Sequence, residues 1–135
     1  KALKCAALSG VEVIILFPKI ADHKIVNTAS YSYFQEILEC GGKVYLYNKG
    51  FLHSKVIIID DFMVSTGSAN MDLRSFKLNF EVNAFIYDEK VISEIKEDFM
   101  NDLKSSEELE RNKFENRKIR MKIKESVSRL FSPIL

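Results

Sequence analysis

One stretch, Leu52 to Asn70, constrains the fold more than any other part of the chain. It reads LHSKVIIIDDFMVSTGSAN. Its β-branched run Val56–Ile59 favours a strand over a helix, and a continuous apolar run of this kind predicts a strand buried on both faces. Side chains two positions apart in a strand lie on the same face. His53 and Lys55 are therefore expected to project together beside this strand.

The pairing of His53 with Lys55 indicates phosphate chemistry. An imidazole can attack phosphorus, and an ammonium group can hold a non-bridging phosphate oxygen. A lone histidine near a strand is more often structural, and a lone Gly67-Ser68-x-Asn70 is usually a turn. The two features at this fixed spacing are much more specific than either one alone.

The rest of the chain predicts an α/β fold, with a mixed β-sheet flanked by helices. Turn and cap signals between the periodic segments set their limits. The expected strands are Val11–Phe17, Lys43–Tyr47, Lys55–Asp60, Met63–Thr66 and Phe80–Tyr87. The expected helices are Lys1–Ser9, Ile25–Glu39 after an Asp22 N-cap, a single turn at Asp72–Phe76, Glu89–Ser105 and Glu107–Phe131. On the second helix, Ile25, Ala29, Tyr33, Ile37 and Cys40 are predicted to share the apolar face.

Composition places the chain among globular proteins and excludes several other classes. It has 135 residues, of which 47% are hydrophobic and 29% charged, and these are ordinary values. Cys5 and Cys40 form no disulfide or metal pattern, and no apolar run approaches the length that spans a bilayer. The chain opens on Lys1 without Met, so we expect a fragment of a longer protein. His23 is expected at the surface.

Charge divides the chain into two parts. Residues 111–135 carry a net charge of +6, against −5 for the remainder. We therefore expect a body over residues 1–106 and a basic amphipathic helix over residues 107–135. Such a helix can lie on an anionic membrane surface, although its first half can equally pack its apolar face on the body.

The central stretch resembles the His-x-Lys-x4-Asp signature of the phospholipase D superfamily with its Gly-Ser-x-Asn extension. The whole chain resembles the C-terminal half of bacterial cardiolipin synthases, most distinctively in GSANMDLRSF and LNFEVNAFIYD. Members usually have Ala where this chain has Ser54 and Leu or Ile where it has Met71. The residues matching the signature are His53, Lys55, Asp60, Gly67, Ser68 and Asn70.

This resemblance implies a phospholipase D-like half-domain that shares one active site with a missing N-terminal half carrying the first motif. The implied enzyme joins two phosphatidylglycerol molecules into cardiolipin and glycerol through a phosphohistidine, without metal or cofactor. His53 would be nucleophile or general acid, and Asp60 would tie the motif together. Lys55 and Asn70 would hold phosphoryl oxygens, and Ser68 would contact substrate. Glu81 would accept a hydrogen bond from the His53 ring and orient it.

The resemblance also implies partners and a location. The partners would be the phospholipid substrate and an anionic membrane surface, with no nucleic acid. The complete protein would be anchored in the bacterial cell membrane by segments outside this chain, with a soluble catalytic part. A hydrolytic phospholipase D and a homodimeric single-motif nuclease remain alternatives, and so does a non-enzymatic membrane-binding module. The acidic body argues against the nuclease, because a phosphate backbone needs a basic cleft.

Overall fold

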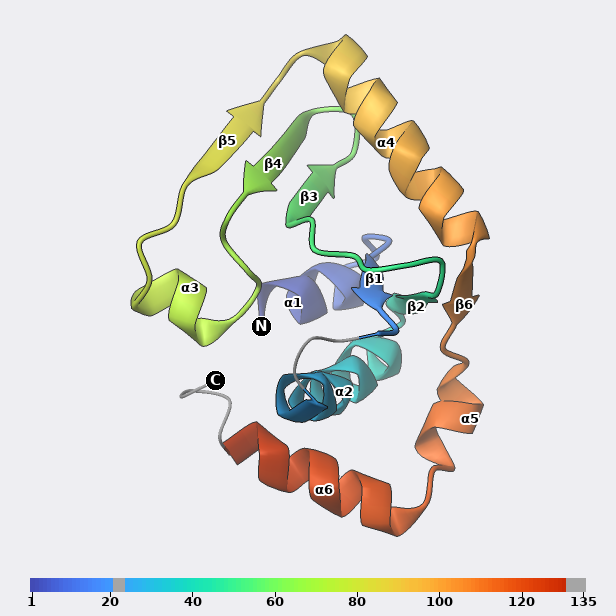
Figure 1. The fold of residues 1–135 in the computed structure, drawn as a ribbon. Helices are drawn as coiled ribbons and strands as arrows, with labels where there is room; N and C mark the ends of the chain where they lie inside the picture. The colour runs from blue at the N-terminus through green and yellow to red at the C-terminus, as the bar shows by residue number, and fades with distance from the viewer. Residues whose placement is uncertain (21–23, 131–135) are drawn as a thin grey trace.

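The computed structural model of the chain describes residues 1–20 and 24–130 (Figure 1). The predicted N-cap Asp22 and the surface residue His23 lie outside these ranges. The helices are α1 (Ala2–Leu8), α2 (Lys24–Glu39), α3 (Leu73–Lys77), α4 (Glu89–Lys104), α5 (Arg111–Glu115) and α6 (Ile119–Leu130). The strands are β1 (Ile14–Pro18), β2 (Lys43–Tyr47), β3 (Val56–Ile59), β4 (Met63–Gly67), β5 (Asn83–Ile86) and β6 (Ser106–Glu108).

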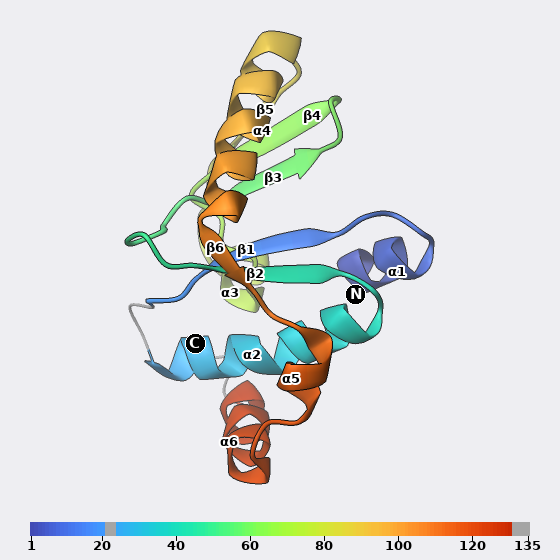
Figure 2. The ribbon, with the colours of Figure 1, turned by 90° about the vertical axis from the view of Figure 1, so that its right-hand side faces the viewer.

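The α/β class predicted from the sequence is confirmed, and the strands divide between two sheets. Sheet A has the order β1-β2-β6, in which β1 and β2 are parallel and β6 is antiparallel to β2. Sheet B has the order β3-β4-β5 and is antiparallel throughout. Figures 1 and 2 show sheet A above α2, and α4 running beside sheet B. The ion pair between Lys96 of α4 and Asp61, 2.6 Å long, links α4 to the β3–β4 turn.

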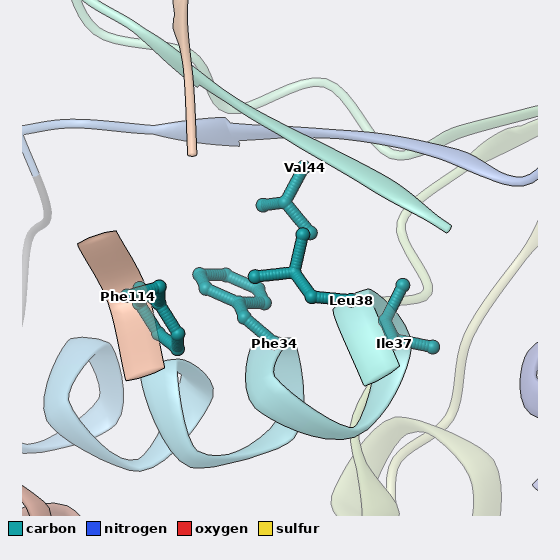
Figure 3. Packing of buried hydrophobic residues seen from close by; sticks show 5 residues of the cluster. All are labelled: Phe34, Ile37, Leu38, Val44 and Phe114. Atoms are coloured by element: carbon teal, nitrogen blue, oxygen red, sulfur yellow. The ribbon is translucent and has the colours of Figure 1, made fainter. Parts of the chain in front are cut away.

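The main core lies between sheet A and α2. Figure 3 shows Phe34, Ile37 and Leu38 of α2 together with Val44 of β2 and Phe114 of α5. Ala29 and Ile37 of the apolar face predicted for α2 are buried as expected, but the buried face also includes Phe34 and Leu38. Tyr33, which was assigned to the predicted face, is 38% exposed, whereas the neighbouring Phe34 is buried. A phenylalanine has no hydroxyl to satisfy, so it takes the buried place beside a tyrosine that can reach water.

Strand β3 differs from its prediction. It was expected to be buried on both faces, but Val56, Ile57 and Ile59 are all about 40% exposed. β3 lies at the edge of its small sheet. The fully buried residues near this part of the fold are Val64 of the central strand β4 and Ile92 of α4. The continuous apolar run thus predicted the strand correctly, but the expectation that both of its faces are buried was wrong.

The single helix predicted over Glu107–Phe131 is wrong. Residues 106–108 form β6, which pairs with Tyr45–Tyr47 of β2, and the Leu109 amide donates to the Val44 carbonyl at 2.8 Å. Two separate helices, α5 and α6, follow, and Phe131 lies outside the described residues. Backbone pairing with a distant strand and burial of the Phe114 ring outweigh the local helical pattern. The division of the chain at residue 106 stays a prediction.

A buried ion pair fixes α6 against the rest of the fold. An Arg117 guanidinium nitrogen lies 2.8 Å from a Glu125 carboxylate oxygen, and the two side chains are only 11% and 7% exposed. The guanidinium carbon also lies 3.2 Å from the centroid of the Phe114 ring. Burial lowers the pKa of Arg117, and the Glu125 charge opposes that shift. Removing either partner would leave a buried charge uncompensated.

We therefore predict that Glu125→Ala lowers the free energy of unfolding by about 3 kcal/mol. The matched control is Glu115→Ala, which removes a more exposed carboxylate paired with Arg111 four residues away and should cost about 0.5 kcal/mol or less. Urea unfolding of both variants beside wild type gives the comparison. Equal losses in the two variants would contradict the anchoring role of the Arg117–Glu125 pair.

Candidate functional site

The two predicted reactive side chains lie just before β3 rather than inside it. His53 is exposed, and its ring stacks on Phe51 with centroids 5.5 Å apart and an interplanar angle of 16°. Lys55 is half-buried, and its Nζ donates to the His53 carbonyl oxygen at 2.6 Å. The segment before β3 therefore leaves the His53 imidazole accessible and holds the Lys55 ammonium group against the His53 backbone.

Strand pairing brings the two halves of the sequence motif together. In the β3–β4 register Val56 pairs with Thr66, so Lys55 and Gly67 are adjacent, and the Gly67 amide donates to the Lys55 carbonyl at 3.3 Å. Ser68 continues the arrangement toward β5, because its amide donates to the Val82 carbonyl at 2.9 Å. The start of β3, the end of β4 and the approach to β5 meet at one end of sheet B.

Gly67 is required by the close approach of these segments. A Cβ atom at this position would lie 2.1 Å from the Val82 carbonyl oxygen and 2.7 Å from the Asn83 Cα. Both are backbone atoms and cannot move aside as a flexible side chain could. The glycine of the Gly-Ser-x-Asn extension thus allows the backbone after β4 to pass directly against the backbone before β5.

The Glu81 carboxylate is the centre of the site. It accepts hydrogen bonds from Ser68 Oγ at 2.5 Å, Ser75 Oγ at 2.8 Å and Asn79 Nδ2 at 3.2 Å. These bonds, that from Ser68 first, lower the pKa of Glu81 below its ordinary value of 4.5, and the positive charge of Lys55 adds to the effect. Hydrogen bonds to the ionised form favour it. The site therefore holds a fixed negative charge close to Lys55.

The predicted hydrogen bond between Glu81 and the His53 ring is not formed in this structure. Among the described residues, the donors to Glu81 are Ser68, Ser75 and Asn79, and the His53 ring lies on Phe51 instead. Local donors within fourteen residues of Glu81 occupy both carboxylate oxygens. An exposed imidazole has no comparable constraint on its rotamer.

Asn70 and Asp60 lie in very different places. The backbone amide of Asn70 donates to Ser75 Oγ at 3.1 Å, so Asn70 sits beside the Glu81 cluster, and its side chain is exposed. Asp60 lies at the opposite end of β3, in the turn closed by the Phe62 amide and the Ile59 carbonyl. Its φ of 48° is left-handed, which Asp tolerates better than most residues. The structure brings His53, Lys55, Asn70 and Glu81 to one end of sheet B but leaves Asp60 away from them.

Sequence reasoning missed three residues that support this cluster: Ser75 and Asn79, which donate to Glu81, and Asn83 beside them. Ser75 is 7% exposed, and its amide donates to the Asp72 carboxylate at 2.7 Å, which caps α3. Asn83 accepts from the Ala69 amide and donates to Ser65 Oγ. The sequence does predict the cap, because Asp72 is a favoured N-cap residue three positions before Ser75. The links to Glu81 and to Ala69 depend on how the strands pair, and local pattern does not reveal that.

Comparisons with known proteins give a consistent result. The model of the family described as "Cardiolipin synthase, PLD-like domain" matches residues 1–103. A cardiolipin synthase of Geobacillus kaustophilus is 54% identical over 134 residues, and cardiolipin synthase 2 of Bacillus anthracis is 52% identical over the same length.

The chain belongs to the cardiolipin synthase family of phospholipase D-like domains. The two relatives match 99% of this chain, and the chain spans about a quarter of their length, 27% and 26% respectively. The crystal structure of Nuc, a phospholipase D family member from Salmonella typhimurium, has a TM-score of 0.69 and 24% identity. That match covers 80% of this chain and 70% of Nuc and supports the fold alone.

Two further observations concern the described part of the chain. None of its helices combines the length and the apolar character needed to cross a bilayer. Within the same residues, no group of three or more His, Cys, Asp or Glu side chains is arranged to hold a metal ion.

We predict that Ser68→Ala raises the pKa of Glu81 toward 4.5, because the strongest hydrogen bond to the ionised carboxylate is lost. Carboxyl-detected NMR titration measures this directly. Since the folded pKa is depressed, the bonds stabilise the fold above pH 4.5 and lose that effect as pH falls through the folded value. The stability of wild type should therefore fall more steeply with acid than that of the variant. An unchanged Glu81 pKa would contradict the network.

Proposed function

We propose that this chain is the part of a cardiolipin synthase that carries one His-x-Lys motif of a two-motif active site. The reaction transfers a phosphatidyl group between two phosphatidylglycerol molecules and yields cardiolipin and glycerol. Membership of the family supports the reaction class. The observation that carries the proposal is the convergence of His53, Lys55, Asn70 and the ionised Glu81 at one end of sheet B.

The proposed chemistry uses two imidazoles on opposite sides of one phosphorus. One imidazole nitrogen attacks the phosphodiester of a phosphatidylglycerol, and the bond from phosphorus to the headgroup glycerol oxygen breaks. The other imidazole gives a proton to that oxygen, so glycerol leaves and a phosphatidyl-histidine remains. The now neutral imidazole takes the proton from a headgroup hydroxyl of a second phosphatidylglycerol. That oxygen attacks phosphorus, the phosphorus–nitrogen bond breaks, and cardiolipin forms.

His53 supplies one of the two imidazoles. The second comes from a further motif-bearing half, which we place in the length of the relatives that this chain does not span. The exposed position of His53 supports this arrangement, since a half-site must present its imidazole to a partner. Either histidine can be the nucleophile, and the other histidine then transfers the proton.

The surrounding residues stabilise the charges of this reaction. The Lys55 ammonium group, now 2.6 Å from the His53 carbonyl oxygen, would swing to a non-bridging phosphoryl oxygen. The side-chain amide of Asn70, through Nδ2, would donate to another non-bridging oxygen. With the imidazole turned off Phe51, Glu81 would accept its second ring N–H and stabilise the imidazolium.

Ser68 takes a role that differs from the one the resemblance implied, whereas Asp60 keeps the supporting role that it was given. Ser68 was assigned to substrate binding, but its hydroxyl donates to Glu81 and accepts from the Val82 amide. We therefore assign Ser68 to holding Glu81 in place. Asp60, at the far end of β3, acts through the turn that joins β3 to β4 rather than through contact with substrate.

The site of action follows from the chemistry of substrate and product. Both are membrane lipids, so the complete protein would work at the cell membrane. Both are also anionic, which fits a site containing the Lys55 cation and a chain whose C-terminal residues 111–135 are basic.

We predict that His53→Asn in the complete protein lowers cardiolipin formation at least about a thousandfold and leaves the thermal unfolding midpoint unchanged, because the ring is exposed. The matched control is Ser54→Ala, which alters the neighbouring exposed side chain and should keep full activity. Thin-layer analysis of products from labelled phosphatidylglycerol gives the measurement. Release of phosphatidic acid by wild type without cardiolipin would show hydrolysis and refute the transfer reaction.

A further inference from the structure

Helix α6 presents its large apolar side chains to solvent, whereas two of its polar side chains, Glu125 and Ser128, face the protein. Glu125 and Ser128 are 5% and 9% exposed. The large aliphatic side chains of the helix are far more exposed, at values between 49% and 76%. They recur at intervals of four, four and three residues, which places them on one side of a helix. We name this side the outer face of α6, formed by Ile119, Ile123, Val127 and Leu130.

The inverted orientation follows from how α6 is held. Glu125 is drawn inward by the buried Arg117, and α6 packs across α2. Figures 1 and 2 show α2 between sheet A and α6, so the side of α6 away from α2 is also the side away from the sheets. An amphipathic surface helix normally turns its apolar side toward the core. Here the apolar side points outward and is left for something outside this chain.

The charges beside the outer face are of one sign. Lys118, Arg120 and Lys124 are all exposed. Glu125 is the only acidic residue of α6, and it is buried and paired with Arg117. The described exposed charges from residue 118 to 130 are therefore all positive. An apolar stripe bordered by cations is complementary to a surface of anionic headgroups over acyl chains.

We propose that the outer face of α6 docks on an anionic phospholipid membrane surface. The aliphatic side chains enter the boundary between headgroups and acyl chains, and Lys118, Arg120 and Lys124 meet lipid phosphates. This deepens the proposed function, on which the choice of phosphatidylglycerol as lipid rests. It also divides the basic segment by role: α5 is structural, since its Phe114 is 4% exposed in the core, and α6 is the contact element.

A single tryptophan can report the contact, because the chain contains none. Ile123→Trp places the reporter on the outer face, and Leu8→Trp places the control on an exposed residue at the end of α1. Each variant of the 135-residue chain is mixed with phosphatidylglycerol vesicles or phosphatidylcholine vesicles at low salt. We expect a blue shift and quenching by brominated acyl chains only for Ile123→Trp with phosphatidylglycerol. Unchanged emission from Ile123→Trp would overturn the proposal.

Co-sedimentation with phosphatidylglycerol vesicles separates the two components of binding. The first double variant, Ile119→Ser with Ile123→Ser, removes apolar side chains from the outer face. Its control, Leu8→Ser with Val11→Ser, removes comparably exposed apolar side chains elsewhere. The second double variant, Lys118→Glu with Arg120→Glu, reverses two charges beside the outer face. Its control, Lys49→Glu with Lys90→Glu, reverses two exposed charges elsewhere. Each outer-face pair should weaken binding about tenfold or more, and each control pair should weaken it much less. Thermal unfolding verifies that all four variants are folded.

The outcomes distinguish this proposal from the proposed function. Equal vesicle binding by wild type and both outer-face variants would refute membrane docking, and the face would then be a protein–protein contact. Binding is measured without turnover, so docking stands even if the complete protein makes no cardiolipin. Conversely, cardiolipin synthesis by a protein whose α6 variants bind vesicles normally would leave the proposed function intact and refute the docking.

Discussion

The ionised carboxylate of Glu81 is the interaction on which the candidate site depends. Its three donors come from the residue after β4, from α3 and from the loop before β5. One side chain therefore joins three segments of the chain through side-chain hydrogen bonds. The hydrogen bonds connect the backbone segments on either side of Asn70. Because each bond favours the ionised form of Glu81, the network also keeps a negative charge beside Lys55. Gly67 makes the arrangement possible by allowing two backbones to pass in contact.

The architecture separates the candidate catalytic residues from the parts that provide stability. The main core, with Phe34, Val44 and Phe114, lies between sheet A and α2. The candidate catalytic residues lie at one end of sheet B, where His53 and Asn70 are exposed. Residues on loops supported by a rigid scaffold can turn toward substrate at little cost. The exposed imidazole before β3 thus fits the proposed half-site, which a second motif would complete.

The sequence predicted what local pattern determines and failed where distant segments decide. Lys43–Tyr47 was predicted with its observed limits, and α4 to within one residue, because each has a clear period and clear boundaries. The helix over Glu107–Phe131 failed because β6 finds a backbone partner in β2 some sixty residues earlier. The motif residues were identified by their spacing, whereas Ser75 and Asn79 became visible only once Glu81 was placed in space.

In the proposed mechanism, one end of sheet B binds a phosphoryl group between His53, Lys55 and Asn70. A crystal structure of the complete protein with vanadate, which resembles the five-coordinate phosphorus of the proposed reaction, tests it most directly. We expect the vanadium within bonding or hydrogen-bonding reach of the His53 ring, Lys55 Nζ moved from the His53 carbonyl to a vanadate oxygen, and Asn70 Nδ2 on another oxygen. Vanadate bound elsewhere, with Lys55 still on the His53 carbonyl, would contradict the account.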